Sequence, residues 1–113
     1  MRSDRTIYRG KRFGVDTTSP FEITVNGETL PLTPSLRIRS HSPDGFNFGY
    51  GGSGPSQLAL AILFDFTGDA TLAKKRYMNF KFAFVARWGN EWEIDGKSIR
   101  AWLDGSHRDK LVS

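Results

Sequence analysis

Short stretches of alternating apolar and polar residues in the first third of the chain predict β-strands. Three stretches read this way: residues 6–13, 21–25 and 28–32. Asn26 and Gly27 stand between the second and third of them, and this pair best suits a two-residue type I′ hairpin turn. Because Pro31 cannot donate a ladder hydrogen bond, we expect the third strand to end early or to lie at an edge.

The hairpin also predicts which side chains face each other. Counting from the turn, Ile23 lies opposite Leu30 and Phe21 lies opposite Leu32, so one face is apolar. Residues 35–41 alternate once more and predict a further strand. Because side chains alternate between the faces of a strand, the outer face of that predicted strand carries a cationic row of Arg37, Arg39 and His41.

The middle of the chain is apolar with almost no polar face, which predicts a central helix over residues 55–66. Ser53 or Gly54 is the expected N-cap, and Pro55 fits the first helical turn because its missing N–H is not needed there. At twelve or so residues this stretch is too short for a membrane span, which needs about 20.

A second helix is expected over residues 70–86, capped by Asp69. Its apolar stripe leaves Phe82 outside, and three lysines, Lys74, Lys75 and Lys81, are expected in solvent. Residues 91–95 predict a short strand.

Asp95 is expected to cap a last helix that ends near Gly105, and residues 106–113 are expected to be a loose tail. The pattern therefore predicts one α+β domain over residues 1–113 with its core over 6–104. Its architecture is a small antiparallel sheet of three to five strands packed against two or three helices.

Composition limits the chemistry. The chain has no cysteine and two histidines, which excludes disulfides, thiolate metal sites and cysteine nucleophiles and disfavours a zinc site. We expect no cofactor and no metal. The N-terminal residues lack the apolar core of a signal peptide, so we expect a cytoplasmic protein with no membrane partner. The net charge of +4 agrees with an anionic partner without requiring one.

The most unusual segment is residues 41–57, where a glycine- and aromatic-rich loop leads into the apolar helix. Its five glycines suggest a backbone geometry that other residues cannot adopt, and Gly51 and Gly52 are the positions we expect to need it. Three aromatic side chains alternate with these glycines and could contact a ligand: Phe46, Phe48 and Tyr50.

Residues 49–54 satisfy a G-x-G-x-x-G pattern but lack most of the context of a dinucleotide site, and no Lys-Ser/Thr pair follows to make a Walker A motif. The plainest interpretation is a loop that crosses close to the sheet. The alternative is a less specific site, in which the helix start holds a nucleotide or another anion together with Ser53, Ser56 and Gln57.

His41 titrates near neutral pH and precedes Asp44 by three residues. A hydrolase or transferase using His41 is one hypothesis, and a structural histidine that bonds to a backbone carbonyl is the favoured one. Residues 42–45 suit a turn, which explains Asp44 without catalysis. No catalytic residue is assigned.

The segment HSPDGFNFGYGGSGPSQLALAIL, residues 41–63, resembles the signature HSPTGFEWGYGGSGPAQLALALL of a family of small uncharacterised proteins of bacteria and their phages, a domain of unknown function. The likeness covers roughly residues 7–104. Asp44, Asn47, Phe48 and Ser56 depart from the family pattern. The resemblance implies a phage or mobile-element setting and supplies no activity, cofactor or catalytic residue.

Three functions follow as hypotheses. The first is a small non-enzymatic protein that binds a host macromolecule or ligand stoichiometrically, with inhibition of a bacterial defence system as a special case. The second is a nucleic-acid- or nucleotide-binding module that uses the loop and nearby arginines. The third is the small hydrolase or transferase. The candidate binding residues are Arg37, Arg39, His41, Phe46, Phe48, Tyr50, Gly51, Gly52, Ser53, Ser56 and Gln57.

Overall fold

The computed structural model describes the backbone of residues 1–112 and the side chains of residues 1–105. Its sheet is antiparallel throughout, in the order β3-β2-β1-β4. The strands are β1 (Ile7–Arg12), β2 (Phe21–Val25), β3 (Glu28–Thr29) and β4 (Glu91–Asp95). The helices are α1 (Thr33–Ile38), α2 (Ser53–Thr67), α3 (Ala70–Ala83) and α4 (Gly96–Val112), with a 3-10 turn η1 (Val85–Arg87) after α3.

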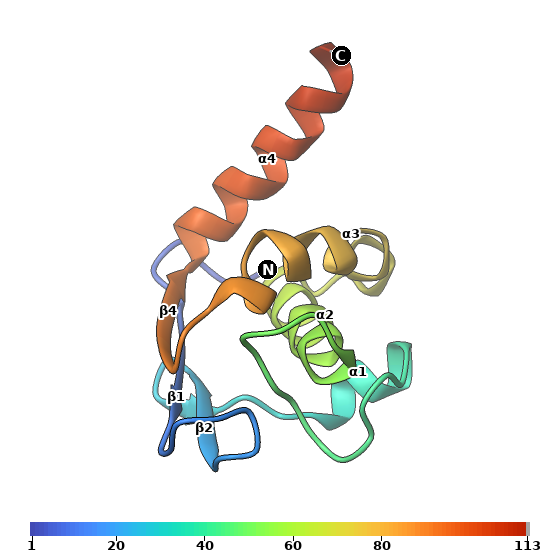
Figure 1. Ribbon diagram of the computed structural model, residues 1–113. Coiled ribbons are helices and arrows are strands. Elements are labelled where there is room, and N and C mark those ends of the chain that lie inside the picture. The colour runs from blue at the N-terminus through green and yellow to red at the C-terminus, as the bar shows by residue number, and fades with distance from the viewer. Residues whose placement is uncertain (113) are drawn as a thin grey trace.

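This arrangement confirms the predicted α+β class. Helices α1, α2 and α3 lie to one side of the sheet, and α4 extends away from the body of the molecule (Figure 1). The central helix is also confirmed, since twelve of the fifteen residues of α2 are buried. Among the described residues, no helix combines the length and the apolar character that a membrane crossing needs.

The pleat of the strands separates two faces of the sheet. On the inner face Tyr8, Ile23 and Ile94 join the core under α2. Gly10 lies on the same face and pairs with Trp92 of β4. A side chain does not fit at position 10, because a Cβ there would lie 2.3 Å from the Trp92 indole. Trp92 in turn stacks on Trp88 at 3.8 Å between ring centroids.

Local turn and cap chemistry agrees with the predictions. Asn26 and Gly27 both have positive φ, as a type I′ turn requires. Asp69 accepts a hydrogen bond from the Leu72 amide and caps α3. Asp95 accepts one from the Ser98 amide at the start of α4.

One predicted strand is wrong. Residues 33–38 form α1, and the chain leaves the helix at Arg39. Pro34 sits in the first turn of α1, where its fixed φ favours the helix. Ser35 is fully buried and donates to the Leu32 carbonyl, so a polar residue occupies the inner position. The cationic row expected on this segment therefore does not form as a strand face.

Four smaller differences concern the ends of elements. The Leu30 amide bonds to the Ile23 carbonyl as expected, but Leu32 leaves the hairpin and precedes α1 instead of pairing with Phe21. The N-cap of α2 is Gly52, with no side-chain cap. Helix α3 ends at Ala83, and α4 continues past Gly105 to Val112. The prediction of a loose tail is therefore wrong for residues 106–112, whose backbone continues α4, and Ser113 lies outside the described residues.

Candidate functional site

The loop of residues 41–54, here called the glycine loop, is anchored from below by Gln57. This side chain is fully buried on α2. Its Oε1 accepts hydrogen bonds from the amides of His41 at 2.7 Å and Ser42 at 3.1 Å. Its Nε2 donates to Ser35 Oγ at 2.9 Å and to the Arg39 carbonyl at 3.0 Å. Because all of its polar groups are used inside the protein, Gln57 holds the loop in place and does not face a ligand.

Arg12 ties the middle of the loop, at Asn47 and Phe48, to β1. Its buried guanidinium donates to Asn47 Oδ1 and to the Phe48 carbonyl at 3.2 Å, and it lies 4.1 Å from the centre of the Phe48 ring. Phe48 is fully buried and packs edge-on against Phe21 and Trp92. The expectation that Phe48 offers a surface to a ligand is therefore wrong, since the ring belongs to the core.

The glycines that need an unusual backbone are not the two expected. Gly45 and Gly49 have positive φ, at 143° and 87°, whereas Gly51 and Gly52 do not. Gly49 is doubly constrained, because a Cβ there would lie 2.9 Å from the Trp88 carbonyl oxygen. Gly52 instead makes room for a neighbour, since the Tyr50 ring lies against it.

His41 is half-buried and its Nε2 lies 2.6 Å from the Tyr77 hydroxyl on α3. This contact, rather than the expected backbone carbonyl, fixes the ring. Burial lowers the pKa of His41, and the nearby charges of Arg39 and Lys81 lower it further. Asp44 belongs to the predicted turn, in which the Gly45 amide donates to the Ser42 carbonyl at 3.2 Å. The geometry thus gives His41 a structural partner.

Lys81 departs most from its expected place. It was expected in solvent but is only 3% exposed, and its Nζ donates to Ser56 Oγ at 2.9 Å. Ser56 is itself buried and donates to the Gly52 carbonyl at 3.2 Å. The ammonium also lies 4.3 Å from the centre of the Phe82 ring. Burial lowers the pKa of Lys81 because the charged form loses water.

A polar hollow of about 200 Å³ opens in front of the first turn of α2. Its lining comprises Ser42, Asp44, Gly45, Phe46, Asn47, Tyr50, Ser53 and Gly54. Ser53 is thus the one member of the expected anion-binding trio that faces this hollow, because Ser56 and Gln57 point into the protein. The carboxylate of Asp44 at the same hollow repels an anion.

Three large apolar side chains lie exposed around the glycine loop. Tyr50 is 40% exposed, Met78 is 40% exposed and Phe82 is 57% exposed. They are contiguous, because Phe82 lies beside Gly51, the Tyr50 ring covers Gly52, and the Met78 sulfur lies 3.8 Å from Ser56 Oγ. We call Tyr50, Met78 and Phe82, with Gly51 and Gly52 between them, the loop patch. Phe46 is half-buried against the core and contributes less.

The arginines do not join these aromatics in one row. Arg37 and Arg39 are exposed on and after α1. Near the N-terminus, Arg2 pairs with Asp65 at 2.7 Å, and Arg9 pairs with a glutamate of β4. Arg2 and Arg9 are therefore already paired with acids, and Arg37 and Arg39 belong to a different element from the loop aromatics.

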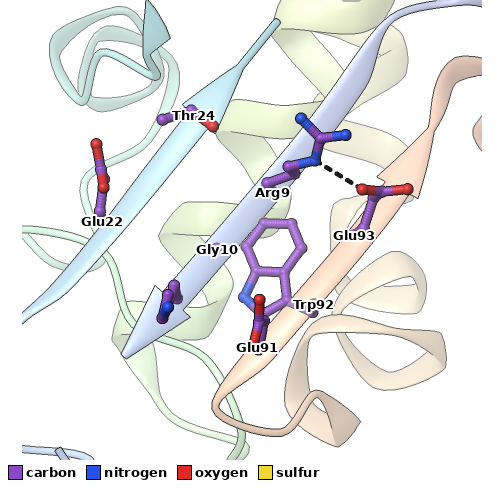
Figure 2. Close-up of a pocket in the computed structure, with 8 residues that line it drawn as sticks. Arg9, Gly10, Glu22, Thr24, Glu91, Trp92 and Glu93 are labelled. Atoms are coloured by element: carbon purple, nitrogen blue, oxygen red, sulfur yellow. Dashed lines mark hydrogen bonds and ion pairs between the residues drawn. The ribbon is translucent and has the colours of Figure 1, made fainter. Parts of the chain in front are cut away.

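A larger hollow, of about 430 Å³, lies on the outer face of the sheet. Figure 2 shows Arg9 on β1 reaching Glu93 on β4, with Gly10 and Trp92 alongside. The Arg9 Nε and Glu93 Oε1 atoms are 2.6 Å apart, and both side chains are more than half exposed. Since bases on the central strand alternate with acids on both neighbours, the charges offset each other and the face resembles an ordinary solvated sheet.

A comparison with protein-family models gives a match that includes the glycine loop and α2. A family model described as a family of unknown function, DUF6166, matches residues 8–105. The chain belongs to the DUF6166 family. No curated protein and no solved structure matches it. That description assigns no activity to the family, and the origin of this DUF6166 member in bacteria or phages stays a prediction.

Sequence reasoning missed three members of the site, namely Met78, Lys81 and Phe82. The exclusion of Phe82 from the apolar stripe of α3 was the available signal, since a large apolar residue outside the stripe points to solvent. The burial of Lys81 had no such signal. Within the residues whose side chains are described, no three histidine, cysteine or acidic side chains gather in a way that could hold a metal.

Proposed function

We propose that this DUF6166 protein is a non-enzymatic binding protein that binds a partner macromolecule through the loop patch. The observation that carries the proposal is the contiguous exposure of Tyr50, Met78 and Phe82. Isolated exposed apolar residues are ordinary on protein surfaces, whereas contiguous ones mark interaction sites. Tyrosine, phenylalanine and methionine are also the residues that protein interfaces favour.

The support beneath the patch adds to the proposal. Gln57 holds the start of the glycine loop and Arg12 holds its middle by hydrogen bonds, so Tyr50 projects from a braced segment. Phe82 and Met78 stand on α3, a regular helix that packs along α2. Because the backbone that carries Tyr50, Met78 and Phe82 is ordered before binding, ordering this surface costs less free energy when a partner binds.

The alternative functions have less support. A nucleic-acid module needs stacked aromatics beside cations, but Phe48 is buried and Arg2 and Arg9 are paired with acids. A nucleotide or other anion at the α2 start meets the carboxylate of Asp44. A hydrolase using His41 lacks the acid partner that would orient the ring, because the ring contacts Tyr77.

The resemblance supplies the wider setting of this proposal. The sequence analysis favours a phage or mobile-element origin, a cytoplasmic location and, as a special case, the inhibition of a bacterial defence system. The loop patch agrees with each of these, because each requires a protein that binds its partner stoichiometrically. A host protein complex is the partner that this setting suggests. The chemistry of the surface is what can be tested directly.

The test uses selection from a library of random displayed peptides on the immobilised full-length protein. Peptides that bind the loop patch should lose about tenfold or more in affinity for Phe82→Ala, since truncating a central aromatic anchor has an effect of this size. Val15→Ala is the matched control, because Val15 is 91% exposed on the turn after β1 and outside the patch. Enriched peptides that bind both variants as they bind the wild type would refute the proposed surface.

A further inference from the structure

The charge of helix α3 gives the loop patch a chemical preference. Between Asp69 and Glu91 the sequence contains no acid and five bases, namely Lys74, Lys75, Arg76, Lys81 and Arg87. Lys74 and Lys75 are exposed and precede Met78 by four and three residues, so they lie on the same face of α3 as the patch. Phe82 follows Met78 one turn later on that face.

A further positive charge lies beneath the patch. The Lys81 ammonium is buried under the Phe82 ring, and it donates a hydrogen bond to the neutral hydroxyl of Ser56. Within the described side chains, no carboxylate lies within ion-pair distance of Lys81. Arg39 and Lys81 both lower the pKa of His41, so two positive charges act on the start of the glycine loop. Asp44 and Tyr50 line the same hollow at the start of α2.

We propose that the loop patch binds an acidic protein segment whose apolar side chain packs against Met78 and Phe82 and whose carboxylates face Lys74 and Lys75. This inference rests on the proposed function and names the class of its partner. Charge complementarity of this kind raises the association rate and excludes basic competitors. The buried charge of Lys81 acts in the same direction, because a carboxylate brought near Phe82 is attracted by it.

A protein segment fits this surface better than the two other polyanions that a basic helix could attract. Binding to nucleic acid depends mainly on several phosphate contacts, and only Lys74 and Lys75 flank the patch on α3. An anionic membrane binds helices whose apolar stripe is broad, whereas the broad apolar face of α3 is already packed against α2. What remains free is a compact apolar centre with basic residues on one side.

The test examines the peptides selected on the wild-type protein. Their sequences should be enriched in Asp and Glu next to an aromatic or aliphatic residue. The double variant Lys74→Glu/Lys75→Glu should weaken their binding by about tenfold at low ionic strength and by less at high salt, because exposed charges are screened. Arg5→Glu/Lys97→Glu is the control with the same change in net charge, because Arg5 and Lys97 are both exposed and lie outside the patch.

The outcomes separate the two proposals. Peptides that depend on Phe82 but carry no acidic bias, or that bind the double variant as tightly as the wild type, overturn the acidic partner and leave the binding surface standing. Failure to enrich any peptide that depends on Phe82 overturns both. Single-stranded oligothymidine and phosphatidylserine vesicles serve as further probes, and tight binding of either through Lys74 and Lys75 without such peptides would assign the face to a different polyanion.

Discussion

Replacement of Gln57 by alanine tests how the glycine loop is held. The substitution removes four hydrogen bonds and a fully buried side chain. Each such bond contributes about 0.5–1.5 kcal/mol net, and the half-exposed loop lets water replace part of the loss, so we expect a decrease of about 3 kcal/mol in the free energy of unfolding. For a domain of this size that corresponds to a fall in Tm of about 12 °C.

The assay is thermal unfolding followed by circular dichroism, with amide hydrogen exchange as a second readout. The amides of His41 and Ser42 should lose protection in Gln57→Ala, because Gln57 Oε1 is their acceptor. Ser53→Ala is the control, since Ser53 is exposed and should shift Tm little. If Gln57→Ala lowers Tm by less than about 3 °C and leaves the protection of both amides unchanged, the anchoring role is refuted.

Three further predictions concern the same region. Gly49→Ala should lower the free energy of unfolding by about 1–3 kcal/mol, because Gly49 has positive φ and meets the Trp88 carbonyl, while Gly51→Ala should change it by less than about 0.5 kcal/mol in the same denaturant titration. Lys81→Met should raise Tm at neutral pH, because the lowered pKa of Lys81 shows that its charged form is disfavoured in the folded state. In the wild type, the free energy of unfolding should rise as the pH increases toward the ordinary pKa of lysine, because the unfolded chain binds that proton more tightly. This rise should be absent in Lys81→Met. The lowered pKa of His41 means that the unfolded chain binds the proton more tightly, so stability should fall as the pH drops below about 6.5, and His41→Gln should flatten that fall in melts at graded pH.

Local chemistry explains which parts of the fold could be predicted. The turn at Asn26-Gly27, the caps Asp69 and Asp95 and the apolar run of α2 each depend on neighbours in sequence, and each appears where expected. Helix α1 could not be predicted from period alone, because six residues with alternating apolar positions suit a strand or a short helix equally. In the folded protein Ser35 of α1 is buried and accepts a hydrogen bond from Gln57 on α2, a contact between residues that are remote in sequence.

The candidate site shows the same division. The pattern drew attention to the loop, but it could not show which aromatic side chains turn inward. Phe48 is drawn into the core by Arg12 and Trp92, which are remote in sequence, whereas Tyr50 two residues later stays outside. Likewise Lys81 is buried because Ser56 and Phe82 close over it. Such choices depend on tertiary packing that a single sequence does not display.

Amide hydrogen exchange of the full-length protein, with and without a selected peptide bound, tests the central claim most directly. If the loop patch is the binding surface, new protection should concentrate in residues 50–54 and 74–82. Protection confined instead to the outer face of the sheet, in β1 (Ile7–Arg12) and β4 (Glu91–Asp95), would contradict the claim and transfer the binding site to that face.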